Sequence, residues 1–342
     1  MDALNNNLNL LMDFLSNYSN SYSSYDDNMS YTLDTESTLC RLTVVFPPTV
    51  YAIICFFIFC ITLFGNALVL YIFFKFKALA NSVDVLMAGL CCNSLFLCAS
   101  FLFSWLLYVA PQMLTSATCK VEIFFFYLYT YFGVYIVVCI SLIRCLLVVF
   151  SRRPWVKHKA SGFLCVCVSL IVALALSANA SLYRTALRHP ETSEWICYED
   201  AGEDTVNWKL RIRTTSAICG FLVPFGLMVL FYGLTWCMVK STKLARKGAV
   251  RGVIVTVVVL FLIFCLPYHL CNFFDTLLRT GFLAETCYLR DVISVAMHIC
   301  SLLQSMYSAF VPVVYSGLGS LFRRRVRDTW SVFRCFSTSG SL

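Results

Sequence analysis

The sequence predicts an all-α membrane protein, a bundle of seven membrane-spanning helices followed by an amphipathic eighth helix on the cytoplasmic surface. The first observation is composition: 60% of the 342 residues are hydrophobic, 13% are charged and the mean hydropathy is +0.78. A soluble protein has about 25% charged residues. The second observation is that stretches without Asp, Glu, Lys or Arg recur seven times. Each exceeds the roughly 18 to 20 residues that a helix needs to cross a bilayer.

The seven stretches are the predicted helices, and short connections that carry almost all the charge separate them. They are residues 48–74, 85–108, 123–143, 162–183, 214–239, 252–274 and 292–322. The last stretch is too long for one crossing, and Gly317 and Gly319 indicate where the chain leaves the membrane. We therefore assign residues 47–319 to one seven-helix domain.

Residues 1–46 have a different composition, rich in Asn, Ser, Tyr and Asp, with Arg41 as the single basic residue against six acidic ones. This composition predicts a disordered acidic tail. No basic start precedes an apolar core and a cleavage site, so we expect no removable signal peptide. Asn17 and Asn28 begin glycosylation sequons, which require an extracellular tail.

Residues 320–342 predict the eighth helix and a short cytoplasmic tail. Four apolar residues recur at helical spacing between arginines: Phe322, Val326, Trp330 and Phe333. This pattern is typical of a helix that lies on the inner leaflet and binds anionic lipid. The Ser-rich end offers candidate phosphorylation sites.

The basic residues orient the chain in the membrane. With residues 1–46 outside, the inward connections hold 17 of the 26 basic residues and only two of the 18 acidic ones, as the positive-inside rule expects. The net charge of +8 therefore belongs to the inner surface and does not indicate a nucleic-acid partner. We expect a multi-pass membrane protein, with its N-terminus extracellular and its C-terminus cytoplasmic.

Four of the 19 cysteines fall outside the hydrophobic stretches and on the external side: Cys40, Cys119, Cys197 and Cys287. Disulfides persist in oxidising compartments, which agrees with this side being external. The sequence allows three pairings, of which we favour Cys119 with Cys197 and Cys40 with Cys287. Most other cysteines lie in or beside the spans, where we interpret them as small apolar side chains between helices.

Polar residues and prolines inside the spans are the candidate functional residues, because the bilayer makes each of them costly. Arg144 stands out, at the inner end of the third stretch and 25 residues after Cys119. The others are Asn66, Asn93, Pro224, Tyr232, Pro267, Pro312 and Tyr315. In this order and on a seven-span plan, these residues resemble the motifs of rhodopsin-like G-protein-coupled receptors. The external cysteines and the acidic, Tyr-rich tail resemble the chemokine-receptor branch.

Several segments, among them CKVEIFFFYLY, FYGLTWC and YSGLGSLFR, resemble the chemokine-receptor homologues encoded by rhadinoviruses. The resemblance implies a viral chemokine receptor that couples to heterotrimeric G proteins. It also implies ligands of the CXC chemokine class. Chemokines are mostly basic, so an acidic surface would favour their capture.

The resemblance also assigns ligand contacts on the external side. Tyr25 is followed by Asp26 and Asp27, which is a candidate sulfation site. Glu199 and Asp200 extend the anionic surface in the fourth connection. Arg211 and Arg213, at the mouth of the fifth span, would meet acidic groups of the ligand or of that connection.

Departures from the family pattern predict how this chain signals. The family's helix-three motif has an acid before its arginine, where this chain has Ile143-Arg144-Cys145. Further departures are Asn93 for an Asp that helps bind sodium, Cys265 for a Trp and Val311 for an Asn. Because these family residues restrain the resting state, we expect substantial signalling without ligand.

The alternative is a scavenger that captures chemokine without signalling. The family uses Arg144, Tyr232 and Tyr315 to engage the G protein, and their retention favours signalling. An enzyme is not expected, because His269 and His298 are the only span histidines and form no metal cluster. A retinal pump is excluded since the last span has no lysine, and no cofactor is expected.

Overall fold

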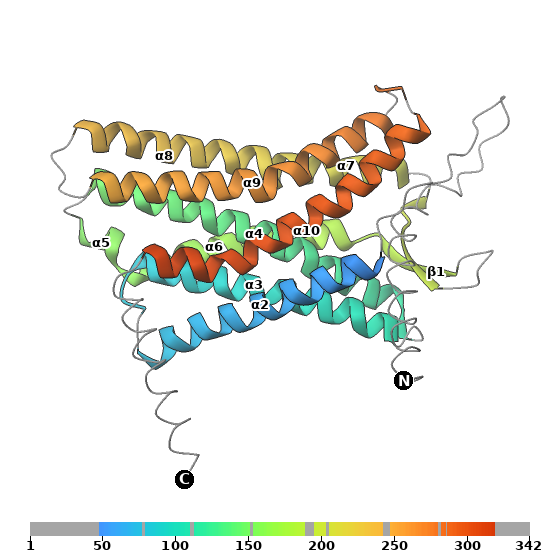
Figure 1. Ribbon diagram of the computed structural model, residues 1–342, viewed down its shortest axis with the longest axis horizontal. Helices are drawn as coiled ribbons and strands as arrows, with labels where there is room; N and C mark the ends of the chain where they lie inside the picture. Colours follow the sequence, from blue (N-terminus) through green and yellow to red (C-terminus); the bar gives the residue numbers. More distant parts are fainter. Residues whose placement is uncertain are drawn as a thin grey trace, which may run out of the picture.

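The structure, a computed structural model, describes nine ranges of the chain: residues 48–76, 79–109, 113–150, 153–188, 195–202, 205–241, 247–279, 282–284 and 286–318. Within them, seven helices are long and apolar enough to cross a membrane. Figure 1 shows these helices running side by side along the long axis. The fold class predicted from the sequence is confirmed. The tail of residues 1–46 and the expected eighth helix in residues 320–342 lie outside the described ranges.

The elements follow in chain order. They are α2 (Pro48–Lys75), α3 (Ser82–Val109), α4 (Ser116–Val149), α5 (Pro154–Lys157), α6 (Lys159–Ser181), β1 (Arg184–Arg188), β2 (Trp195–Glu199), α7 (Thr205–Ala217), the π-helix η4 (Ile218–Leu222), α8 (Val223–Ser241), α9 (Lys247–Arg279) and α10 (Cys287–Leu318). The elements α7, η4 and α8 together make one span, Asn207–Val239.

Several helices extend beyond the charge-free stretches of the sequence. α4 begins at Ser116 because Thr115 and Thr118 form a reciprocal capping box that satisfies the first backbone N–H groups. α9 begins at Lys247, before the charge-free stretch that starts at residue 252. The ends of the charge-free stretches therefore do not coincide with the ends of the helices.

The burial pattern is that of a protein in lipid. Large apolar side chains on the outside of the bundle are exposed, for example Phe64 at 71% and Leu164 at 66%. Polar side chains are enclosed instead, with Thr62 and Asn66 fully buried. Lipid solvates the apolar surface, and the polar groups must be satisfied between helices.

Small residues let α6 approach α3 closely. A Cβ atom on Gly162 would lie 2.6 Å from the backbone oxygen of Ser82, so only glycine fits there. Further along α6, Ser169, Ala173 and Ser177 are buried one turn apart. Close approach of small residues is the usual means of packing membrane helices.

The π-helix η4 widens the fifth span. Pro224 has no N–H to donate to the preceding turn, and the hydroxyl of Tyr135 on α4 donates to the Cys219 carbonyl in that turn at 3.0 Å. Gly220 lies against Tyr131 and His269. The bulge therefore fits the fifth span against α4 and α9.

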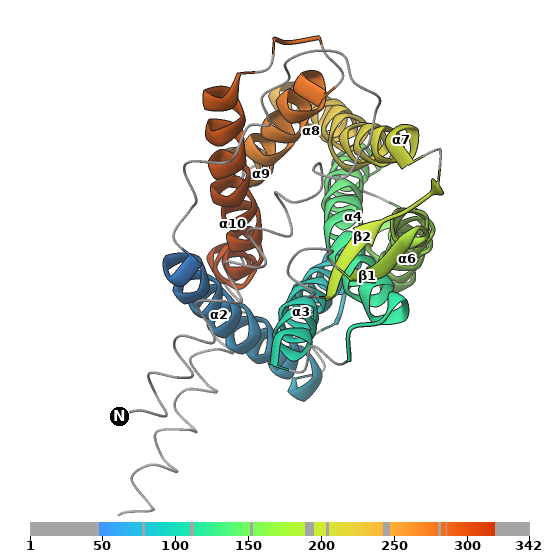
Figure 2. The ribbon, with the colours of Figure 1, turned by 90° about the vertical axis from the view of Figure 1, so that its right-hand side faces the viewer.

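The two strands form an antiparallel hairpin, in which Arg184 pairs with Glu199 and Ala186 with Cys197. Figure 2 shows the hairpin lying over α4 and α6 at one end of the helix ring. We call this end the hairpin end. The opposite end, where α4 meets α5, is the Arg144 end.

Candidate functional site

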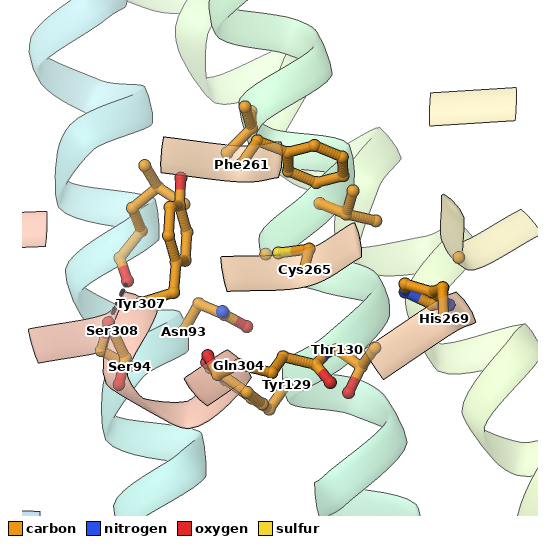
Figure 3. Close-up of a pocket in the computed structure, with 15 residues that line it drawn as sticks. Asn93, Ser94, Tyr129, Thr130, Phe261, Cys265, His269, Gln304, Tyr307 and Ser308 are labelled. Carbon is orange, nitrogen blue, oxygen red and sulfur yellow. Dashed lines mark hydrogen bonds between the residues drawn. The ribbon is translucent and has the colours of Figure 1, made fainter. Parts of the chain in front are cut away.

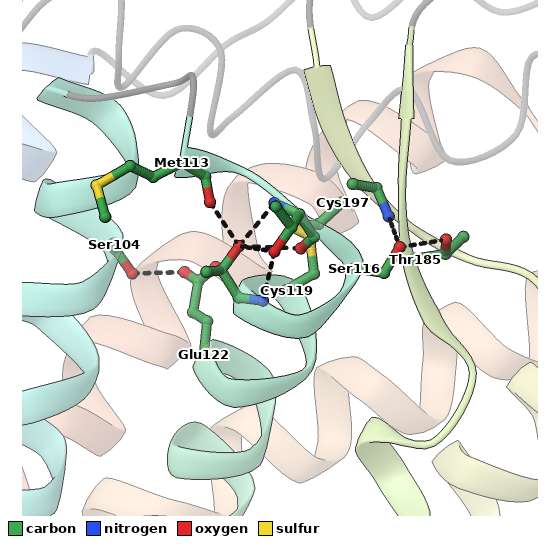
Figure 4. The surroundings of a disulfide bond; sticks show 10 residues. Ser104, Met113, Ser116, Cys119, Glu122, Thr185 and Cys197 are labelled. Atoms are coloured by element: carbon green, nitrogen blue, oxygen red, sulfur yellow. Dashed lines mark hydrogen bonds between the residues drawn. A yellow bond between two sulfur atoms is a disulfide. The ribbon is translucent and has the colours of Figure 1, made fainter.

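The disulfide between Cys119 and Cys197 ties the hairpin to the start of α4, as the sequence predicted. Figure 4 shows the hydrogen bonds around it. The Ser116 hydroxyl accepts from the Ala186 N–H at 3.1 Å and lies 2.8 Å from the Thr185 hydroxyl. The hairpin is thus held by one covalent bond and two hydrogen bonds at the same turn of α4.

The other expected disulfide is described in part. Cys287 is disulfide-bonded. Cys40, which we favour as its partner, lies outside the described residues, so this pairing stays a prediction.

A carboxylate that the sequence analysis did not single out lies beneath the hairpin. The Ser104 hydroxyl of α3 donates to Glu122 of α4 at 2.5 Å (Figure 4). Arg184 of β1 acts electrostatically on the same carboxylate. Glu122 therefore links two helices and the hairpin. An acidic residue three positions after Cys119 is visible in the sequence, but its partners come from two other segments.

Among the described residues, Arg213 pairs with an acid that the sequence analysis did not consider. Its guanidinium lies 2.6 Å from the carboxylate of Asp275, and both side chains are mostly buried. This ion pair joins α7 to α9 at the hairpin end. Arg211 is exposed, so the two arginines expected to bind ligand differ in their surroundings.

Of the acids expected in the fourth connection, Glu199 is the last residue of β2 and pairs with Arg184, the first residue of β1. Asp200 is exposed, and its carboxylate accepts from the Gly202 N–H at 2.9 Å. Gly202 has a φ of 65°, a conformation that glycine adopts most readily. The remaining ligand residues Tyr25, Asp26 and Asp27 lie outside the described residues, as do the sequons at Asn17 and Asn28.

A small pocket lies in the middle of the bundle. Figure 3 shows side chains converging on it. It brings together two residues singled out from the sequence, Asn93 of α3 and Cys265 of α9. His269, Tyr307 and Ser308 also line it.

Asn93 fills the space over Gly133 of α4. A Cβ atom on Gly133 would lie 2.5 Å from the Asn93 side-chain nitrogen. The Asn93 side-chain oxygen is buried and has no hydrogen-bond partner among the described residues. The residues that line the pocket include no acid, so the pocket offers a cation neutral ligands only.

Asn66 links α2 to α10 beside this pocket. Its side-chain nitrogen donates to the Thr62 carbonyl at 2.8 Å and to the Ser308 carbonyl at 3.1 Å. The hydroxyls of Thr62 and Ser308 lie 3.2 Å apart. The sequence singled out Asn66 as a candidate functional residue, and these contacts show that it joins the first and seventh spans.

At the Arg144 end, Arg144 is flanked along α4 by Ile143 and Cys145, which are 2% and 5% exposed. Within the described ranges, the Nε atom of Arg144 and the hydroxyl of Tyr232 are buried without a hydrogen-bond partner. Tyr232 of α8 and Asp84 of α3 act electrostatically on the guanidinium. Asp84 was counted only as an inner acid in the sequence and was given no role.

The remaining residues singled out from the sequence lie on the last two spans. Pro267 is inside α9. Val311, Pro312 and Tyr315 are in the last turns of α10. The residues singled out from the sequence are thus spread over six of the seven spans, and none of them lies on α6.

Comparison with known proteins decides the family. The profile described as "7 transmembrane receptor (rhodopsin family)" matches residues 65–315. The chain belongs to this family. The receptor is therefore a G-protein-coupled receptor and not an enzyme, as expected from the sequence.

Two viral proteins and a mammalian one illustrate the similarity. The receptor is 44% identical over 319 residues to the "viral G-protein coupled receptor" of Human herpesvirus 8 type P (isolate GK18), and the match covers 93% of each chain. It is 34% identical over 262 residues to the "G-protein coupled receptor homolog ECRF3" of Saimiriine herpesvirus 2 (strain 11), covering 77% of this chain and 80% of that one. The "C-X-C chemokine receptor type 1" of Homo sapiens is 30% identical over 268 residues, 78% of this chain and 76% of that one.

Proposed function

We propose that the receptor is a viral chemokine receptor that activates heterotrimeric G proteins without needing a ligand. The observation that carries the proposal is the environment of Arg144. Its neighbours in α4 are the buried, uncharged Ile143 and Cys145. Among the described residues its Nε atom has no hydrogen-bond partner, and the acid that acts on it electrostatically, Asp84, lies on α3 and not beside it in α4.

The absence of an acid beside Arg144 changes the free-energy difference between the resting and the active conformation. An acid beside the arginine would stabilise the resting conformation, and Ile143 provides no charge. A loss of about 1.4 kcal/mol of differential stability changes the ratio of active to resting receptor tenfold. A second weakened restraint multiplies this effect if the two are independent.

The central pocket supports a second weakened restraint. Asn93 and the other lining side chains are neutral, so a sodium ion would gain little there. Sodium would then stabilise the resting conformation weakly. Cys265, in place of a bulky family residue, leaves the same pocket with a small side chain on α9.

The ligand side of the proposal rests on the relatives and on charge. Relatives of this receptor include C-X-C chemokine receptors types 1 and 2, and we infer CXC chemokines as ligands. The hairpin end presents Asp200 and Arg211, both exposed. Asp200, together with Tyr25, Asp26 and Asp27, which lie outside the described residues, would capture a basic chemokine, and Arg211 would meet acidic groups of that ligand.

The same reasoning orients the receptor in the host plasma membrane. The hairpin end carries a disulfide, which agrees with an extracellular position. The Arg144 end exposes Lys75, Arg153, Lys157 and Lys159, as expected at the cytoplasmic surface. The C-terminal segment, with its lipid, arrestin and kinase contacts, would follow on the cytoplasmic side.

Nucleotide exchange on a G protein, measured in membranes without chemokine, tests the proposal. We expect exchange well above that of membranes lacking the receptor, and a fall to that background for Arg144→Ala. Lys120→Ala is the matched control because it removes an exposed cation from the same helix. Background exchange from the wild type at normal surface expression would favour the chemokine scavenger instead.

A further inference from the structure

Two cysteine side chains meet between the sixth and seventh spans. The sulfur of Cys271 on α9 lies 3.6 Å from the sulfur of Cys300 on α10. Both are free thiols and both are half-buried. A thiol is a weak hydrogen-bond donor and acceptor, so this contact adds little stability while both thiols stay reduced.

The pair lies beside the central pocket. Cys271 follows the pocket residue His269 by two positions, and Cys300 precedes Gln304 by four. Further toward the Arg144 end, α9 and α10 touch through Phe264 and Phe310, whose ring centres are 5.0 Å apart. The two thiols therefore form a second contact between α9 and α10, which lies nearer the hairpin end than the contact between the two phenylalanine rings.

We propose that Cys271 and Cys300 form an oxidisable dithiol site that reacts with small peroxides and ties α9 to α10 by a reversible disulfide. One thiolate attacks the peroxide oxygen, which gives a sulfenic acid and, with hydrogen peroxide, releases water or hydroxide. The second thiol attacks that sulfur and expels a second water. One peroxide is reduced to two waters and two thiols are oxidised to one disulfide.

The geometry suits this reaction. The sulfur atoms lie 3.6 Å apart and must approach to about 2.05 Å to form a disulfide. The receptor has another interacting thiol pair, Cys139 and Cys165 between α4 and α6. The Cys139 sulfur also lies 3.4 Å from the Ser169 hydroxyl. It therefore contacts a hydroxyl group as well as the Cys165 thiol.

A disulfide at Cys271 and Cys300 would restrict relative movement of α9 and α10 next to the pocket. Switching between conformations in which packed helices slide or rotate requires such movement. This consequence rests on the proposed ligand-independent activity, and we expect oxidation to lower basal nucleotide exchange by about twofold or more.

Peptide mapping of the oxidised receptor tests the site directly. Receptor in lipid nanodiscs is treated with hydrogen peroxide, free thiols are blocked with N-ethylmaleimide, and proteolytic peptides are analysed by mass spectrometry. We expect the peptides that carry Cys271 and Cys300 to become linked and lighter by the two thiol hydrogens. Reduced glutathione should release this link and spare Cys119–Cys197, because structural disulfides resist glutathione.

Variants separate the site from other effects of peroxide. Cys271→Ser and Cys300→Ser should each abolish the link and the fall in nucleotide exchange. Cys237→Ser, which removes an exposed thiol of α8, should retain both. The absence of linked peptides in the wild type, or a link between Cys139 and Cys165 alone, would overturn the site.

The nucleotide-exchange measurement can contradict the proposal separately from the peptide mapping. If peroxide lowers exchange equally in Cys271→Ser, the disulfide does not restrict switching and that part of the proposal is wrong. If the reduced wild type shows no basal exchange, the proposed ligand-independent activity fails, whereas peptide mapping still decides whether the dithiol site exists.

Discussion

The two ends of the helix bundle are held in different ways. At the hairpin end, a disulfide, the hydrogen bond from Ser104 to Glu122 and the ion pair of Arg213 with Asp275 involve five different elements. Around Arg144, the described residues provide no comparable bond to its guanidinium Nε. If the proposed function is correct, this difference means that the ligand-binding end is fixed by bonds between elements whereas the switch around Arg144 is weakly restrained.

The largest effect is expected from opening the disulfide. Cys197→Ser frees the hairpin from α4, and loss of a native disulfide typically costs about 2 to 5 kcal/mol. We expect chemokine affinity and thermal stability to fall together, as measured by radioligand binding and by a melting curve of the purified receptor. Cys237→Ser, at an exposed free cysteine, controls for loss of a thiol.

Basal signalling of the Cys197→Ser receptor tests whether the two ends of the bundle act independently. Any Cys197→Ser receptor that reaches the cell surface should keep its ligand-independent output, because the switch lies at the opposite end. Loss of basal output at matched surface expression would show that the two ends are not independent.

The middle of the bundle should respond next most strongly. Gly133→Ala places a methyl group 2.5 Å from the Asn93 side-chain nitrogen, and forced overpacking typically costs about 1 to 3 kcal/mol. We expect a lower melting temperature. Gly226→Ala is the matched control, because a Cβ there has nothing within 4 Å. Equal stability of the two variants would contradict a tight contact between α3 and α4.

An acid placed beside Arg144 should stabilise the resting conformation at the Arg144 end. Ile143→Asp places a carboxylate beside Arg144, and a gain of about 1 to 2 kcal/mol for the resting conformation would lower basal output roughly 5- to 30-fold. Basal nucleotide exchange checks this. Ile143→Asn controls for the polar side chain without its charge, and a similar fall in that variant would rule out the ion-pair explanation.

The smallest effect is expected from the ion pair between α7 and α9. Because Arg213 and Asp275 are partly exposed, their coupling should be worth about 1 kcal/mol or less. A double-mutant cycle with Arg213→Ala and Asp275→Ala, read by thermal stability, measures the coupling. Arg211→Ala should show none with Asp275→Ala. A coupling of zero for Arg213 would remove this bond from the description of the hairpin end.

Much of the architecture could be predicted from the sequence. The seven spans were recognisable because hydropathy and the absence of charge are local properties. The Cys119–Cys197 bond could be favoured because few cysteines lie at the oxidising end. Helix ends were predicted less well, since capping at Thr115 and basic residues at the start of α9 extend helices past the charge-free stretches.

The partners of the polar residues were harder to foresee. Arg213 and Asp275 are both visible in the sequence as charges near the end of a span, yet nothing local pairs them. Gly133 was overlooked because the sequence of a helix does not show which side chain of another helix packs against its glycine. The π-helix at Ile218–Leu222 was likewise missed, since it depends on the hydroxyl of Tyr135 from another helix.

The sequence by itself determined which segments cross the membrane, which end carries the disulfide and that Arg144 has no acid beside it in the chain. These properties are local, because each span must satisfy its own backbone hydrogen bonds in lipid. Only the tertiary structure decided which side chains meet across helices: Asn93 over Gly133, Arg213 with Asp275, and Cys271 with Cys300. The rotation and tilt of each helix are set by its neighbours and not by its own hydropathy.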